Sequence, residues 1–418
     1  MTPVRWSFVL AALLLAAPSL AGQGEPQGAT CANCHRRLSD ERLSQPARDY
    51  PNDVHAKSGF GCLACHGDPA MAGPGGSFLA RPDRREVANV CGHCHSDGAF
   101  MRQYNPSLRV DQVAEYRTSV HGRRLAATGD TSVAVCVSCH PAHNIRPPSD
   151  PESSVFALNV ATTCGHCHAD STRMAHYGIP TDQESEYESS VHAQWMKEKE
   201  DLSAPTCNDC HGNHGAAPPG VGSVRAVCGQ CHSVMATLYV GSGHDQYFRN
   251  DSLPGCVTCH GNHAIQLPTD ERLTLVADSV CTRCHTGADT AAQTFLAIRS
   301  LIDSLRLSRE QAQTTLEEAE NAGMEVSDAQ FQLEDATNAL VQARTAIHSF
   351  NVDSVHKKVS AGLAITTAAE QRGQGALGEH LFRRQGLAVS VGIILLLMAG
   401  LVLKIREQDR RSAGGAHE

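Results

Sequence analysis

All 18 cysteines of the chain lie in nine C-x-x-C-H motifs, numbered here in chain order, and none is left over. Two thiols at this spacing can add to the vinyl groups of one haem, and the histidine that follows can bind its iron. Zinc sites and redox dithiols also use C-x-x-C, but neither requires that histidine nine times in nine. Disulfides would not impose this pentapeptide either. The spacing therefore predicts nine covalently attached c-type haems.

The residues predicted to hold these haems are the two cysteines and the histidine of each motif. The cysteines are Cys31, Cys34, Cys62, Cys65, Cys91, Cys94, Cys136, Cys139, Cys164, Cys167, Cys207, Cys210, Cys228, Cys231, Cys256, Cys259, Cys281 and Cys284. The proximal iron ligands are His35, His66, His95, His140, His168, His211, His232, His260 and His285. Aromatic residues make up only 5% of the chain, so we expect the porphyrins to form the core and the apoprotein not to fold.

Histidines outside the motifs are predicted to bind iron from the opposite side. Seven recur at fixed positions of a repeat, either ahead of its second motif or just after it: His55, His121, His192, His244, His143, His214 and His263. His348 and His356 complete the set, on one face if a single helix holds both. His176 is a reserve candidate, whereas His93 and His166 lie between the cysteines of their own motifs.

The number of distal ligands decides the chemistry. If every iron has two histidine ligands, no coordination site is open, and the protein only transfers electrons. An iron that lacks its second histidine would instead mark a reaction centre.

Two apolar segments predict export and anchoring. Residues 1–21 resemble a signal peptide, with an apolar run after Arg5 and small residues near Ala21. Residues 385–404 form an apolar stretch just long enough to cross a bilayer, and positive charges follow it. The haem domain, 22–287, and a helical stalk, 288–384, are therefore expected outside the cytoplasm, with 405–418 as a cytoplasmic tail. The net charge of −9 and the lack of a basic patch exclude nucleic acid as a partner.

The segment from about Asp289 to Gln371 contains no proline and no cysteine, and its apolar residues follow steps of three and four. One stripe consists of Ile298, Ile302, Leu305, Ala312, Leu316 and Ala319, and the facing stripe of Ala329, Leu333, Ala336, Leu340, Ala343 and Ile347. This pattern predicts an antiparallel hairpin, in which Gly323 ends the first helix and Ser327 caps the second. A short third helix is expected to lead to the anchor.

The order of C-x-x-C-H, S-V-H and C-x-x-C-H-x-x-H units, followed by long helices, resembles the multihaem cytochrome c superfamily. That group contains the nitrifiers' tetrahaem cytochrome, hydroxylamine oxidoreductase and pentahaem nitrite reductase. The resemblance covers roughly Cys31 to Ala369. It implies haems stacked in parallel and perpendicular pairs as an electron wire, with His55, His121, His192 and His244 among the distal ligands.

Three departures separate this chain from the enzymes of that group. It has no C-x-x-C-K motif, which nitrite reductases of the group commonly carry at their catalytic haem. Its last tyrosine is Tyr247, so the helical region has none to cross-link to a haem as in hydroxylamine oxidoreductase. Quinol-oxidising members carry an N-terminal anchor and only four or five haems, whereas this chain has nine motifs and its predicted anchor follows them.

The expected fold is mostly helical with extensive loops: a haem-stacked core, a long hairpin and one C-terminal transmembrane helix. The expected function is electron relay by a cytochrome of a bacterial inner membrane, with its haem domain in the periplasm. Its partners would be the bilayer, a quinol-oxidising membrane subunit, and a periplasmic or outer-membrane cytochrome, and the hairpin could support oligomers. Alternatives are a reductase of a small nitrogen or sulfur oxyanion with one five-coordinate haem, a subunit of a quinol-oxidising complex, and a polymerising structural wire.

Overall fold

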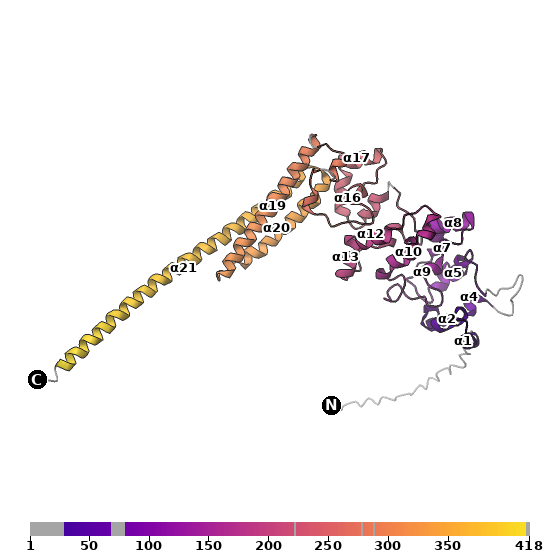
Figure 1. Cartoon of the computed structure of the whole chain (residues 1–418), viewed down its shortest axis with the longest axis horizontal. Coiled ribbons are helices and arrows are strands. Elements are labelled where there is room, and N and C mark those ends of the chain that lie inside the picture. Colours follow the sequence, from indigo (N-terminus) through magenta and orange to yellow (C-terminus); the bar gives the residue numbers. More distant parts are fainter. Residues whose placement is uncertain (1–28, 68–79, 221–222, 277–278, 287–288, 415–418) are drawn as a thin grey trace, which may run out of the picture. The chain divides into compact units, whose positions relative to one another are not determined.

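A computed structural model describes residues 29–67, 80–220, 223–276, 279–286 and 289–414 (Figure 1). The predicted signal peptide, residues 1–21, lies outside these ranges. Within them the chain is mostly helical and contains no β-strand. The described residues fall into two compact units, the first ending at Pro218 and the second beginning at Pro219.

The first unit consists of short helices joined by irregular segments. Its α-helices are α1 Ala29–His35, α2 Glu41–Asp49, α3 Val54–Lys57, α4 Leu63–His66, α5 Val87–His95, α6 Gly98–Met101, α7 Gln112–Thr118, α8 Val120–Thr128, α9 Cys136–Cys139, α10 Val160–His168, α11 Ser171–Ala175, α12 Gln183–Glu188, α13 Val191–Glu198 and α14 Cys207–His211. Short 3₁₀ turns cover Tyr50–Asn52 and Ala157–Asn159. One small cluster of buried side chains contains Val87, Leu125, Val133 and Val135. This is little apolar packing for so long a stretch of chain.

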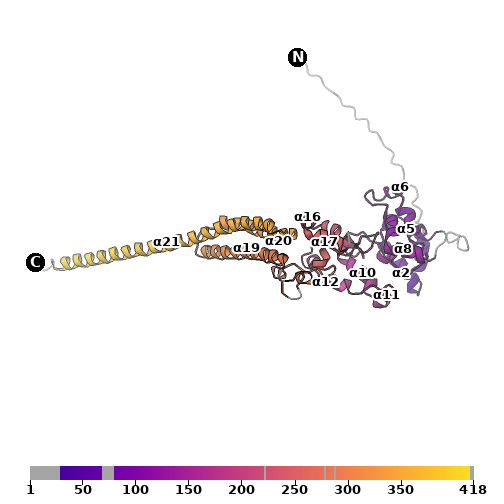
Figure 2. The same ribbon diagram turned by 90° about the horizontal axis from the view of Figure 1, so that it is seen from above.

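The second unit joins the last three motifs to long helices. Its α-helices are α15 Val224–Gly229, α16 Ser233–Val240, α17 Gly243–Asn250, α18 Cys256–His260, α19 Thr290–Asn321, α20 Ser327–Ala346 and α21 Val352–Gly414, with 3₁₀ turns at Asp270–Arg272, Cys281–Arg283 and Ile347–Ser349. Helices α19, α20 and α21 pack against one another as a bundle (Figures 1 and 2).

The predicted apolar stripes form the core of this bundle. Ile298, Ile302 and Leu305 pack with Leu340 and Ala343, together with Val355 and Val359 of α21. A second cluster joins Ala312, Leu316 and Ala319 to Ala329, Leu333 and Ala336, and to Ala369 and Ala376. The structure thus confirms the buried faces that the three-and-four spacing predicts for the two helices.

Two details of the helical region differ from the sequence prediction. The third helix is not short, because α21 continues without a break from the bundle into the apolar segment. Ser327 is the first residue of α20 rather than its cap, and its backbone N–H donates to the Glu325 carboxylate at 3.1 Å. Gly323 follows the end of α19 with a positive φ of 78°, as expected of a helix-ending glycine.

The C-terminal part of α21 is long and apolar enough to cross a membrane. Its side chains over residues 386–403 are almost all exposed. In both views the helix extends past the ends of α19 and α20 (Figures 1 and 2). Such an exposed apolar surface suits lipid contact.

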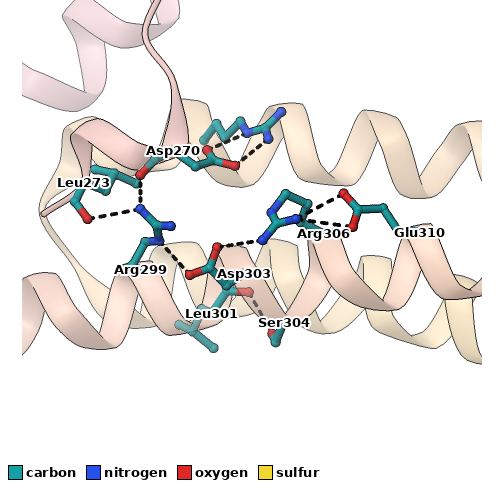
Figure 3. A network of polar contacts seen from close by, with 9 residues as sticks. Asp270, Leu273, Arg299, Leu301, Asp303, Ser304, Arg306 and Glu310 are labelled. Carbon is teal, nitrogen blue, oxygen red and sulfur yellow. Dashed lines mark hydrogen bonds and ion pairs between the residues drawn. The ribbon is translucent and has the colours of Figure 1, made fainter.

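A polar network fastens the segment between the eighth and ninth motifs to the bundle (Figure 3). The Asp270 carboxylate accepts hydrogen bonds from Arg344 Nε at 2.9 Å and from Arg344 Nη2 at 2.6 Å. Arg299 donates to the backbone carbonyls of Asp270 and Leu273, and its Nε donates to Asp303 at 2.6 Å. The Asp270 side chain is only 9% exposed, so its carboxylate is largely shielded from water in this bidentate ion pair. It fixes the end of α20, four residues before His348.

Gly362 allows a close approach between α21 and its neighbours. A Cβ atom there would lie 2.7 Å from Leu305 Cδ2 and 3.0 Å from Ala339 Cβ. We expect Gly362→Ala to lower the free energy of unfolding of the bundle by about 1–2 kcal/mol, because overpacking outweighs the better helix propensity of alanine. Hydrogen exchange of the α19 amides measures this change in the free energy of unfolding. Gly378→Ala is the control: nothing lies within 4 Å of its Cβ, so exchange should slow or stay unchanged.

Candidate functional site

Four histidines outside the motifs are held by the same local device, a side chain that caps the helix start. Asp53, Ser119, Ser190 and Ser242 each precede a short helix, and the histidine is its second residue. Their side-chain oxygens accept a backbone N–H of the first turn, at 2.8 Å from His55 and 2.8 Å from Gly122 in the first two cases. All four caps are buried. The cap thus fixes the start of each helix and, with it, the position of the histidine on the first turn.

Sequence reasoning missed a tyrosine three residues before each cap: Tyr50, Tyr116, Tyr187 and Tyr239. The hydroxyls of the first three donate to backbone carbonyls two residues before the next motif, namely Phe60 at 2.7 Å, Ala134 at 2.9 Å and Pro205 at 3.2 Å. The hydroxyl of Tyr239 lies near Gly255, directly before the eighth motif. Burial raises the pKa of these phenols, that of Tyr239 to about 12, so their hydroxyls remain protonated. The repeated Y-x-x-[S/D]-x-H spacing was the signal for them.

Imidazole rings from distant parts of the chain face each other in pairs, one ring from a motif and one from a histidine outside the motifs. The ring centres are 5.9 Å apart for His66 and His143, 5.9 Å for His95 and His55, 6.3 Å for His140 and His214, 6.2 Å for His168 and His121, 6.0 Å for His260 and His348, and 5.9 Å for His285 and His244. The separation recurs within a narrow range.

That separation matches two imidazoles bound to opposite sides of one metal ion. Metal–imidazole bonds are about 2 Å long, and the bonding nitrogen lies about 1.2 Å from its ring centre, so the two centres would be about 6.4 Å apart, slightly more than the separations in this structure. In the described part of the chain, no three histidine, cysteine or acidic side chains converge as a metal site. A haem needs only the pair, because the porphyrin supplies the other iron ligands. The residues present therefore fit haem.

The planes of the paired rings alternate between two arrangements. They are near-parallel at the second, fourth and eighth motifs, with angles of 4°, 14° and 19°. They are crossed at the third, fifth and ninth, with angles of 89°, 60° and 68°. The crossed pairs use a capped histidine upstream of the motif, and the near-parallel pairs use one downstream of it.

Motifs that are neighbours in sequence are also neighbours in space within each unit. The first thiols of neighbouring motifs lie close enough to act on each other: Cys91 lowers the pKa of Cys136, Cys164 lowers that of Cys207, and Cys228 lowers that of Cys256. The helices that carry them touch: α5 with α9, α10 with α14, and α15 with α18. The second cysteines connect the fourth motif to the fifth and the eighth to the ninth, since Cys139 interacts electrostatically with Cys167 and Cys259 with Cys284.

Burial favours the neutral, metal-binding form in eight of the twelve paired imidazoles. Desolvation lowers the pKa of His95, His121, His140, His143, His168, His214, His244 and His260. A neutral imidazole has a free nitrogen lone pair, whereas the protonated ring has none.

The remaining predicted ligands have other surroundings. His348 lies in the 3₁₀ turn after α20 and His356 lies on α21, so they are not on one helix as the sequence suggested. Within the described ranges no motif imidazole faces His356, whose Nε2 lies 3.3 Å from Ser360 Oγ. His192 holds the capped position of α13, and His263 follows the eighth motif. His176 packs against Tyr177, and His93 and His166 are exposed.

His35 of the first motif differs from the paired histidines. Its Nδ1 lies 3.1 Å from the Leu43 carbonyl oxygen, an arrangement that leaves Nε2 for iron. Among the described residues, no second imidazole faces its ring.

The arrangement is therefore a series of imidazole pairs beside cysteine pairs, ordered along the chain. Compared with protein-family models, with curated proteins and with solved structures, this chain shows no match, so its own residues carry the functional argument.

Proposed function

We propose that this protein is a membrane-anchored multihaem c-type cytochrome that relays electrons. The observation that carries the proposal is the set of imidazole pairs, each with a motif histidine beside two motif cysteines and its ring centre about 6 Å from a second ring. Each haem would be held covalently by the two cysteines, and its iron by the two imidazoles. When bound, the haem supplies reversible one-electron chemistry of its iron.

The chain's own residues would determine the route and the potentials. Within each unit, contacts between successive motifs support transfer from one haem to the next in chain order. Two imidazoles on an iron, as the six pairs would provide, would exclude water and substrate there, and burial of the rings would tune the potential. The proposed location is a bacterial inner membrane, with the haem domain in the periplasm, because signal-like residues 1–21 precede it and positive charges follow the apolar helix.

The proposed partners follow from this location: a quinol-linked membrane donor and a periplasmic or outer-membrane cytochrome as acceptor. Electron transfer needs no acid or base on the path. Catalytic side chains are accordingly not part of the proposal.

The surroundings of His35 favour a second candidate function, reduction of a small nitrogen or sulfur oxyanion at the first haem. Because no second imidazole faces His35 among the described residues, the first iron is where an open coordination position would arise. An open position is what a substrate requires.

Electron paramagnetic resonance of the oxidised, haem-loaded protein tests the relay. Near-parallel and crossed imidazole planes split the iron d orbitals differently, so we expect two classes of low-spin signal. Neither cyanide nor nitrite should change them. A mass increase corresponding to nine haems per chain is the accompanying control.

A high-spin component that shifts with cyanide would contradict a pure relay and support the second candidate. The double variant Cys31→Ser, Cys34→Ser removes the first haem and identifies the origin of such a signal. If the component disappears in this variant, the first haem is the reaction centre.

A further inference from the structure

Asp53 occupies a position where the later repeats have serine. Asp53, Ser119, Ser190 and Ser242 all cap the helix that carries a histidine two residues later. Asp53 is the only one of these four that bears a charge, yet its side chain is 1% exposed. A carboxylate is costly to bury unless hydrogen bonds compensate. A serine would have been sufficient as a cap.

The Asp53 carboxylate makes three hydrogen bonds. Oδ1 accepts the His55 backbone N–H at 2.8 Å and lies 2.9 Å from His55 Nδ1. Oδ2 accepts the Ile145 backbone N–H at 2.7 Å. These three hydrogen bonds compensate the burial of the carboxylate. The short contact to Nδ1 requires that nitrogen to carry the proton, which directs Nε2 toward the partner ring.

The contact to Ile145 joins two candidate ligand segments. Ile145 lies two residues after His143, the partner of His66 in the second motif. Val54 in turn donates its N–H to the Ile145 carbonyl at 2.9 Å. The next repeat has the same backbone link, from Val120 to the Ala216 carbonyl at 3.0 Å, but Ser119 donates to the Tyr116 carbonyl instead of reaching the imidazole. The carboxylate–imidazole contact is therefore what Asp53 adds to the repeat.

We infer that Asp53 is a positioning residue that fixes the His55 tautomer and lowers the reduction potential of the third haem relative to its serine-capped counterpart, the fifth. The inference rests on the proposed function. A carboxylate that accepts the Nδ1 proton raises the electron density at Nε2, and this stabilises ferric iron more than ferrous iron. The fifth haem, held by His121 and His168, has the neutral Ser119 at the same place. Asp289 lies 3.3 Å from His285 Nδ1 at the ninth motif, but its side chain is 37% exposed, so water weakens its influence.

The test is redox titration of the haem-loaded protein with optical and paramagnetic detection. Asp53→Ser substitutes the cap that the other repeats use, so α3 should still form. We expect one midpoint potential of the set to rise, with a change confined to one signal of the crossed-plane class. Asp53→Asn keeps the shape and removes the charge, and should move the same component in the same direction. His55→Met identifies this component, because a methionine ligand raises the potential of its own haem.

The reciprocal variant Ser119→Asp is expected to lower a different component, that of the fifth haem. If Asp53→Ser and Asp53→Asn leave every potential and signal unchanged while nine haems are bound, the inference is wrong and the proposed function stands. If Asp53→Ser converts one haem to high spin while Asp53→Asn behaves as the wild type, Asp53 only holds the helix, and its charge sets no potential. If the wild type binds no haem, the proposed function itself fails.

Discussion

Truncation of the chain after Arg384 is expected to release the protein from the membrane with all its haems in place. The buried contacts of α21 with α19 and α20 reach Ala376 and Leu377, so removal of residues 385–418 takes away no packed side chain. What it removes is the exposed apolar surface of residues 386–403, whose transfer from lipid to water costs on the order of 0.8 kcal/mol per buried CH₂ group. Fractionation of cells and haem staining of both fractions measure the result.

Truncation after Lys404 is the matched control, because it removes the charged tail and keeps the apolar helix. That variant should remain in the membrane fraction. If the protein truncated after Arg384 still sediments with membranes, a second anchor exists, and an uncleaved N-terminal segment becomes the first candidate. A loss of haem in this variant would contradict the separation of anchoring from haem binding.

The second large effect is expected when haem attachment is prevented. In the first unit, the largest side chains that are almost fully inaccessible include Asp53, Ser44, Ser119 and Ser190, all of them polar. In the bundle, they include Ile302, Leu305 and Leu316. The bundle can therefore fold on its own apolar contacts, whereas the motif region lacks a comparable core without porphyrins. We expect protease to degrade the apoprotein up to about Asp289 and to leave α19–α21 as a resistant fragment.

Limited proteolysis followed by mass spectrometry checks this, with the haem-loaded protein as the control. The control should resist cleavage along the motif region as well. A protected motif region in the apoprotein would show that side chains alone form its core, contrary to the prediction. Degradation of both parts would show that the bundle depends on the last haems, through His348 and the contact of Phe350 with His244 at 3.9 Å between ring centres.

The identity of the candidate ligands could be predicted from the sequence, but their pairing could not. A motif fixes its own cysteines and histidine, because the covalent spacing is local. Which distant imidazole faces His66 depends on tertiary contacts such as the Val54–Ile145 link, which no spacing rule encodes. The anchoring tyrosines were missed for a different reason: the spacing of the histidines alone does not reveal the longer repeat, in which Tyr116, Ser119 and His121 belong to one unit.

In the helical region the heptad-like stripes predicted the buried faces, because side-chain direction follows helix periodicity. The boundaries were less predictable. The turn after Ala346 contains no glycine or proline, and Phe350 adopts a positive φ of 51°, a conformation that nothing in its residue type indicates. That turn separates His348 from His356 and explains why the common helix face was wrong.

Because α21 is unbroken, its length sets the distance between the apolar segment and the ligands of the last two motifs. From Val352 to Arg384 the helix measures about 50 Å along its axis, at about 1.5 Å per residue. His348 and Phe350 lie just before its first turn, so the ligands of the last two motifs are at the end remote from the apolar segment. With that segment in a bilayer, the predicted iron sites of the last two motifs would lie tens of ångströms from the lipid tails, out of direct reach of a dissolved quinol. An electron donor to these two haems would need a redox group of its own that stands clear of the membrane.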